Sequence, residues 1–108
     1  MKYALTLTIC LAATGAQAEF ITGNTLLAEM NGTVMEQISA QSYVTGVADA
    51  IAGAFWCPNK YVTVKQVHDI TKKWLEDMPQ HRDNSASAYV RASLGQAFPC
   101  KPASKGAM

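Results

Sequence analysis

The sequence has no excess charge of either sign and no cluster of basic residues. Nine lysines and arginines accompany eight aspartates and glutamates in 108 residues, and only Lys72 and Lys73 are adjacent basic residues. A nucleic-acid-binding domain needs a basic patch that meets phosphates, and a helix on a membrane surface needs a sustained basic face. We therefore expect neither nucleic acid nor a membrane as a partner of the processed protein.

Motifs for catalysis and cofactor binding are also missing. The sequence contains no HExxH, GxSxG, Walker or dinucleotide-binding motif. Its two histidines are His68 and His81. Asp69 follows His68, but adjacent residues on a helix point in different directions and do not orient one another. We therefore expect a protein that is not an enzyme and that uses no cofactor and no metal.

No segment alternates between apolar and polar residues for long enough to indicate a strand. The nearest candidate, Tyr61–Val64, is explained better by a capping box in which Thr63 and Gln66 begin a helix. Helical periodicity and breakers such as Pro79 predict helices over residues 22–30, 34–54, 63–78 and 85–98. The expected fold is all-α, a small bundle of four to five helices.

The apolar spacing also predicts which side chains form the core. In the second segment these are Val34, Ile38, Val44, Val47, Ala48, Ile51 and Ala52. In the third they are Val64, Val67, Thr71, Trp74 and Met78, with Ile70 and Leu75 beside them. In the last they are Ala86, Tyr89, Val90, Ser93, Leu94 and Ala97. We expect Trp74 to be a core residue and not a binding-site aromatic.

The N-terminal residues 1–18 have the layout of a secretory signal peptide. Lys2 precedes an apolar run, Ala4–Ala13, and Ala16-Gln17-Ala18 forms an A-x-A cleavage site. The run is too short to span a bilayer. We expect a periplasmic protein with one helical domain over residues 19–100 and a flexible tail over residues 101–108.

Export changes the interpretation of Cys57 and Cys100, the two cysteines outside the signal peptide. In an oxidising compartment, two cysteines in a chain of this size most often form one disulfide. By closing the loop between these residues, the disulfide would add about 4 kcal/mol to the free energy of unfolding in the chain-entropy model. The alternative is a reactive or metal-binding cysteine, which no CxxC motif or Cys/His cluster supports.

Two polar features are candidates for partner contact. Asp49 lies in an otherwise apolar helical stretch, where it is either a surface carboxylate or a direct contact to a partner. The second feature is the polar loop between the last two helices, with Gln80, His81, Arg82 and Asp83. Such a loop is either solvated or presented to the cleft of a partner enzyme. Arg82 is the expected anchor in the second case, because arginine is enriched among residues that dominate binding energies.

An ordered set of short segments runs through the chain from about Phe20 to Cys100. In order, they are Ile21-Thr22-Gly23-Asn24-x-Leu26-Leu27, Tyr43-Val44-x-Gly46-Val47-Ala48-Asp49-Ala50, Cys57-Pro58, Val62-Thr63-x-x-Gln66-Val67, Trp74-Leu75-x-x-x-Pro79 and Ala97-Phe98-Pro99-Cys100. In this order and spacing, the sequence resembles the Rap/Tai immunity proteins of type VI secretion systems.

The resemblance implies a small helical periplasmic protein that blocks the active-site cleft of a peptidoglycan amidase effector, often as a homodimer. Members of that family commonly carry a further cysteine pair, and Met30 and Ala40 stand at the matching positions here. Which effector is bound does not carry over, because immunity contacts are specific to each pair.

Other functions stay open at this point. The same domain could inhibit another wall-degrading enzyme, such as a phage lysin. A small periplasmic acid-stress chaperone would also be helical and carry a single disulfide, but it would need acid-titrating groups in an interface, and the carboxylates here are scattered. A structural subunit of an envelope complex has no feature for or against it.

Overall fold

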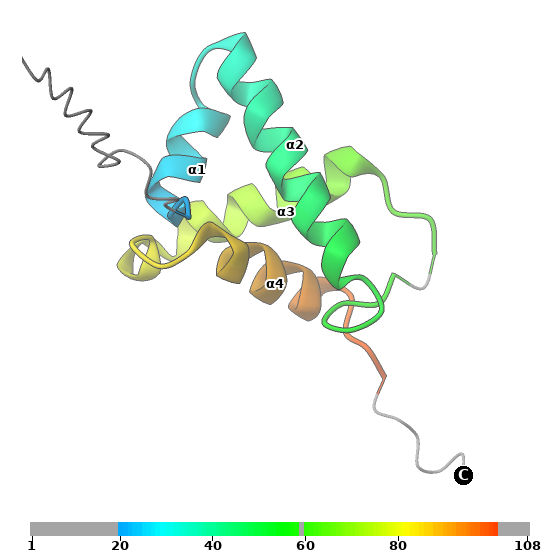
Figure 1. Cartoon of the computed structure of the whole chain (residues 1–108). Coiled ribbons are helices and arrows are strands. Elements are labelled where there is room, and N and C mark those ends of the chain that lie inside the picture. The colour runs from blue at the N-terminus through cyan, green and yellow to red at the C-terminus, as the bar shows by residue number, and fades with distance from the viewer. Residues whose placement is uncertain (1–19, 59, 102–108) are drawn as a thin grey trace, which may run out of the picture.

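The computed structural model describes residues 20–58 and 60–101 (Figure 1). Within these residues the chain forms four α-helices and one short 3-10 helix and no β-strand longer than an isolated bridge. They are α1 (Gly23–Met30), α2 (Val34–Ile51), α3 (Val64–Asp77), the 3-10 helix Pro79–His81, and α4 (Ala86–Ala97). The predicted all-α fold is confirmed. The predicted signal peptide, and residues 102–108 of the predicted tail, lie outside the described residues.

Side-chain caps define where each helix begins. The predicted capping box at α3 is present, because Thr63 accepts from the Gln66 N–H and Gln66 accepts from the Thr63 N–H. Thr33 and Glu36 form a second capping box at α2, which has the same T-x-x-E/Q pattern. Thr22 caps α1, and Ser85 caps α4.

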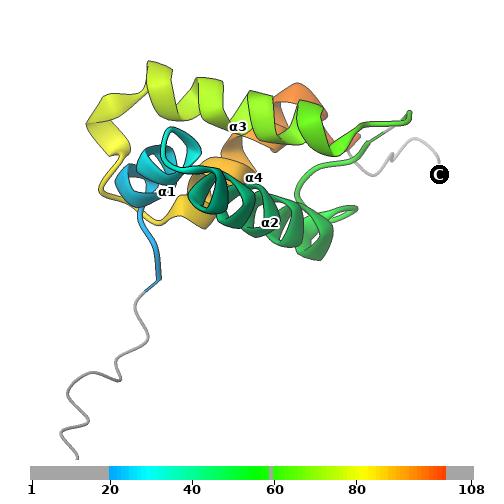
Figure 2. The same ribbon diagram turned by 90° about the horizontal axis from the view of Figure 1, so that it is seen from above.

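The helices pack so that each contacts all the others. In Figures 1 and 2, α2 and α3 lie on opposite sides of the bundle, with α4 beneath and between them. The fully buried side chains are Leu26, Ala40, Val44, Leu75, Ala86, Val90 and Leu94, joined by Thr71 and Ser93. The Thr71 and Ser93 hydroxyls are 3.1 Å apart, and Ser93 also donates to the Val90 carbonyl, which satisfies this buried polar pair between α3 and α4.

The predicted core stripe is wrong at several helix ends. Val34 and Ile38 are 70% and 52% exposed, while Ala40, which the pattern missed, is fully buried. The first turns of α2 extend beyond α3 and α4 and have only the short α1 beside them, so little surface is available to cover them (Figure 1). Three further residues of the predicted stripes are also exposed, each at or next to a helix end: Ala52, Val64 and Ala97.

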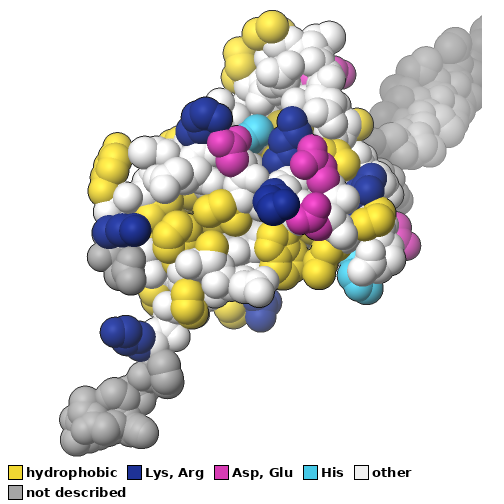
Figure 3. All heavy atoms as spheres, turned by 180° about the vertical axis from the view of Figure 1, so that it is seen from behind, with side chains coloured by type: hydrophobic (Ala, Val, Ile, Leu, Met, Phe, Trp, Pro, Cys, Tyr) yellow, Lys and Arg dark blue, Asp and Glu magenta, His cyan; other side chains and the backbone are white. Residues whose placement is uncertain are grey.

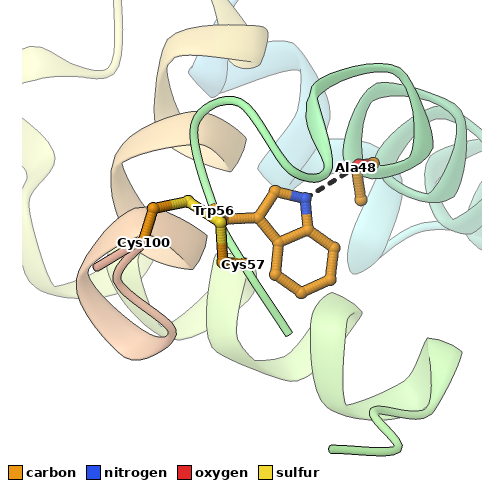
Figure 4. Close-up of a disulfide and its surroundings, with 4 residues drawn as sticks. All are labelled: Ala48, Trp56, Cys57 and Cys100. Atoms are coloured by element: carbon orange, nitrogen blue, oxygen red, sulfur yellow. Dashed lines mark hydrogen bonds between the residues drawn. A yellow bond between two sulfur atoms is a disulfide. The ribbon is translucent and has the colours of Figure 1, made fainter. Parts of the chain in front are cut away.

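The predicted Cys57–Cys100 disulfide is confirmed and forms one end of the bundle (Figure 4). The Cys57 N–H donates to the Phe98 carbonyl over 2.9 Å. Trp56 is buried, its indole N–H donates to the Ala48 carbonyl over 2.8 Å, and its ring lies 5.7 Å from that of Phe98. Covalent bond, hydrogen bonds and aromatic contact thus tie the end of α4 to the connection that follows α2.

Candidate functional site

The polar loop lies at the opposite end of the bundle from the disulfide (Figures 1 and 2). It begins where Pro79 ends α3 and closes at Ser85, the cap of α4, so both of its ends are fixed by helices. Gln80, His81 and Asp83 are exposed. These are three of the five residues predicted to meet a partner, and the structure presents them together on one short turn.

Arg82, the predicted anchor, is placed differently from its neighbours. Its side chain is half-buried, and its Nε is buried without a hydrogen-bond partner among the described residues. The Arg82 carbonyl accepts from the Asn24 N–H over 2.8 Å. Arg82 is therefore turned in part toward the body of the protein, so that its role as an anchor stays a prediction.

The residues that begin α1 line the inner side of this loop, which the sequence pattern did not reveal. The Gly23 N–H donates to the Asn84 carbonyl over 2.9 Å, and the Ala86 N–H donates to the Ile21 carbonyl over 2.9 Å. An antiparallel bridge pairs Thr22 with Ser85. These contacts join segments about sixty positions apart in the sequence, and no local pattern reports such a pairing.

An apolar pocket of about 180 Å³ opens beside the loop. It is lined by Trp74, Met78, His81, Asn84, Ala88, Tyr89 and Ala92. The Tyr89 hydroxyl donates to the Met78 carbonyl over 2.7 Å. Burial raises the pKa of Tyr89, and the nearby Arg82 charge offsets part of that rise, so the hydroxyl is a neutral donor at physiological pH. The pocket therefore offers apolar contact with one imidazole at its edge.

Trp74 belongs to this pocket as well as to the core. It packs against the core but is only half-buried, whereas Leu75, the next residue, is fully buried. The expectation that Trp74 is a core residue is therefore only partly correct. Its side chain packs on the core and also lines the pocket. The buried residues of α3 are Val67 and Thr71, which the predicted stripe contained, and Leu75, which lay beside it and takes the inward place predicted for Trp74.

Asp49, the fifth predicted contact residue, is exposed and far from the loop. It lines a smaller cleft of about 100 Å³ with Thr63 and Val64, at the N-terminus of α3. The structure does not bring Asp49 together with the loop, so its role as a contact to a partner stays a prediction.

The outer face of α3 carries charges of both signs (Figure 3). Lys65 and Asp69 are 2.8 Å apart, and Lys73 and Asp77 are 3.1 Å apart. The hydrogen bond from Lys65 is the main reason why the pKa of Asp69 is lowered. His68 Nδ1 lies 3.6 Å from Asp69 Oδ1, a contact too long for a hydrogen bond, so the two do not form an oriented acid–base pair.

The described residues form neither a metal site nor a membrane-spanning helix. Residues 20–58 and 60–101 contain no group of three His, Cys, Asp or Glu side chains that could hold a metal ion. No helix in the same residues is long and apolar enough to cross a membrane.

An exposed apolar edge on α2 is formed by Val34, Met35 and Ile38. The sequence pattern predicted that Val34 and Ile38 belong to the core.

The fold and the loop together define a small helical domain closed by one disulfide, with a polar loop presented at its other end. The family model of the Rap1a immunity proteins matches residues 22–100, which include all four helices and both cysteines. The chain belongs to this family, as the resemblance implied, and is thus a bacterial immunity protein that binds a cognate effector. No curated protein matches the chain.

Met30 and Ala40, the positions that the resemblance matches to a further cysteine pair, are both buried in the core cluster. Met30 is 4% exposed and Ala40 is fully buried. Apolar packing between α1 and α2 thus occupies these positions, and the flexible methionine side chain suits an irregular space.

Proposed function

We propose that this immunity protein acts in the periplasm, where it binds a peptidoglycan amidase effector of a type VI secretion system and blocks its active-site cleft. The observation that carries the proposal is the family match over residues 22–100. The predicted signal peptide supports the periplasmic location, because a wall-degrading effector would act in that compartment. The protein itself needs no catalytic group for this role, since it inhibits by occupying the cleft.

The loop end is the surface that fits this role best. Gln80, His81 and Asp83 are exposed polar side chains that can pair with the polar groups of a hydrolase cleft. Because helices fix both ends of the loop, little conformational entropy is lost when it binds. The apolar pocket beside it, with Trp74 at its wall, adds contact area that polar side chains alone do not supply.

The proposal is tested by inhibition of a peptidoglycan amidase effector, selected from a panel of purified type VI amidases by pull-down with this protein. The oxidised protein, without residues 1–18, is mixed with that amidase, and cleavage of purified peptidoglycan is followed. We expect stoichiometric inhibition and a complex that isothermal titration calorimetry detects. A phage lysin is the comparison enzyme: inhibition of the lysin with no effect on the amidase would overturn the amidase assignment.

The homodimer that the resemblance implies is part of the proposal and is tested separately. Light scattering gives the mass of the protein in solution, with and without the substitution Ile38→Glu on the exposed edge of α2. We expect a dimer whose mass falls to that of the monomer in the variant. A monomeric wild-type protein would remove the dimer from the proposal and leave the inhibition unaffected.

A further inference from the structure

Gly23, the first residue of α1, is buried where α1 meets the loop and the two helices that flank it. A Cβ atom added at Gly23 would lie 2.9 Å from the Tyr89 ring, 3.0 Å from Leu75 Cδ2 and 3.1 Å from the Arg82 carbonyl oxygen. All three distances are shorter than an ordinary van der Waals contact. Gly46, a helical glycine in α2, has nothing within 4 Å of the same added atom. Only a residue without a side chain fits at position 23.

The close approach lets the start of α1 hydrogen-bond to the loop. The first N–H groups of a helix have no partner within the helix. Here Gly23 and Asn24 donate theirs to the carbonyls of Asn84 and Arg82, over 2.9 and 2.8 Å. The partial positive charge of the helix N-terminus strengthens such contacts to carbonyl oxygens. The backbone of the loop is therefore held from its inner side by backbone groups of α1.

Of the three groups around Gly23, the loop has the most freedom to move. Leu75 is fully buried, and the Tyr89 hydroxyl is bonded to the Met78 carbonyl, so both side chains are held in the core. The Arg82 carbonyl belongs to a loop whose outer side is exposed. A side chain at position 23 would therefore displace the loop before it displaced the core.

We propose that Gly23 is a positioning residue of the effector-binding surface: it brings α1 close enough to hold the loop 79–84 in the conformation that binds. This inference rests on the proposed function, because it assumes that the loop meets the effector. Gly23 would not touch the effector itself. It would act through the carbonyls of Arg82 and Asn84, which accept hydrogen bonds from α1. These bonds would hold the loop backbone, and the backbone orients the side chains at positions 81 and 83.

The first part of the test measures the loop directly, in Gly23→Ala and in the matched control Gly46→Ala. Amide hydrogen exchange is followed at residues 23, 24 and 86, which donate across this contact, and at Val44 and Val90 in the core. In Gly23→Ala we expect exchange at the three contact amides to become about tenfold faster or more, as local opening requires, with the core amides unchanged. Gly46→Ala should accelerate neither set, and the higher helix propensity of alanine should slow exchange in the core slightly. Equal acceleration of all amides would show a purely structural role and overturn the inference.

The second part measures affinity for the amidase used above. We expect Gly23→Ala to weaken binding about tenfold, because the added methyl group displaces the loop until only about a tenth of the molecules keep the binding conformation, while Gly46→Ala binds as the wild type does. Unchanged affinity in a Gly23→Ala variant whose loop exchanges faster would overturn the inference. Failure of the wild type to bind any amidase is a different result, because it rejects the proposed function. The exchange measurement then still decides whether Gly23 holds the loop.

Discussion

The two ends of the bundle are held together in different ways. At one end, the Cys57–Cys100 bond joins the chain after α4 to the connection after α2, and the Trp56 indole donates to Ala48 in α2 (Figure 4). The Trp56 ring also lies against that of Phe98. At the other end, the loop between α3 and α4 is held by backbone hydrogen bonds to the start of α1. The first end has large buried side chains and a covalent bond, and the second has a buried glycine and exposed polar side chains.

This difference separates stability from recognition. A small domain has a limited core, so a disulfide at one end supplies stability that the core alone does not. A binding loop needs exposed polar side chains and can bury few of its own. Backbone hydrogen bonds to α1 fix the shape of the loop without using the side chains that are to meet the partner.

The largest expected effect comes from removing the covalent bond. The double variant Cys57→Ala with Cys100→Ala should lose about 4 kcal/mol of unfolding free energy, because the unfolded chain regains the entropy of the 43-residue loop. Guanidinium denaturation of the variant and of the oxidised wild type gives the difference. Wild-type protein reduced before denaturation is the control and should match the variant. Equal midpoints for oxidised and reduced protein would contradict a stabilising role.

The two tryptophans allow the ends to be compared with the same substitution. Trp56→Phe removes the indole N–H that donates to the Ala48 carbonyl and leaves a void where the larger ring is buried, so it should cost about 2–3 kcal/mol. Trp74→Phe, in a half-buried ring at the pocket, should cost less than about 1.5 kcal/mol. Thermal unfolding of both variants measures the contrast. A larger loss for Trp74→Phe would show that the loop end carries more of the stability.

Tyr89→Phe tests one hydrogen bond at the loop end. The loss of the bond to the Met78 carbonyl should cost about 1 kcal/mol. Because burial raises the pKa of Tyr89, the native state keeps this proton more tightly than the unfolded state does. Its contribution is therefore complete below the unfolded tyrosine pKa of about 10 and is lost as the pH rises above it.

We thus expect wild-type stability to fall between about pH 9 and pH 11 more steeply than that of Tyr89→Phe. Urea denaturation at a series of pH values measures both curves. Tyr43, whose pKa burial also raises, contributes equally to both proteins and leaves a shared slope. Parallel curves would mean that Tyr89 does not titrate differently in the two states.

The smallest effect is expected on the outer face of α3, away from both ends. Lys65→Ala should raise the pKa of Asp69 toward its ordinary value, because the hydrogen bond from Lys65 holds it down. The lowered pKa contributes stability above the unfolded pKa of Asp69, and this contribution is lost as the pH falls through the native value. For so exposed a pair the change should be a few tenths of a kcal/mol. NMR titration of Asp69 measures the pKa, and an unshifted value would contradict the assignment.

The sequence predicted the parts of the fold that depend on local patterns and on the number of cysteines. Thr63 and Gln66 identified the start of α3, the spacing from Ala86 to Leu94 identified the buried face of α4, and Cys57 and Cys100 were paired correctly. Each of these depends on a short motif or on the oxidation state of the compartment.

Features that depend on distant parts of the chain were not predicted. Val34 and Ile38 are exposed because α1, the helix beside them, is short. The spacing of apolar residues in α2 gives no information about the length of a neighbouring helix. The hydrogen bonds from Gly23 and Asn24 arise only when α1 meets the loop. No local pattern predicts the burial of Arg82 Nε. The loop itself was found from its polar residues, but its support from α1 was not.

The most direct test of the account compares one surface variant at each end of the bundle. One variant replaces Gln80, His81 and Asp83 by alanine, and it leaves Arg82 unchanged because Arg82 is partly buried. The other is Asp49→Ala, an exposed residue near the opposite end. Affinity for the amidase that the wild-type protein binds is measured by calorimetry for both variants, after thermal unfolding confirms that each is folded. We predict a loss of 2 kcal/mol or more, about thirtyfold, for the loop variant and wild-type affinity for Asp49→Ala. Wild-type affinity in the loop variant with weakened binding in Asp49→Ala would contradict the account.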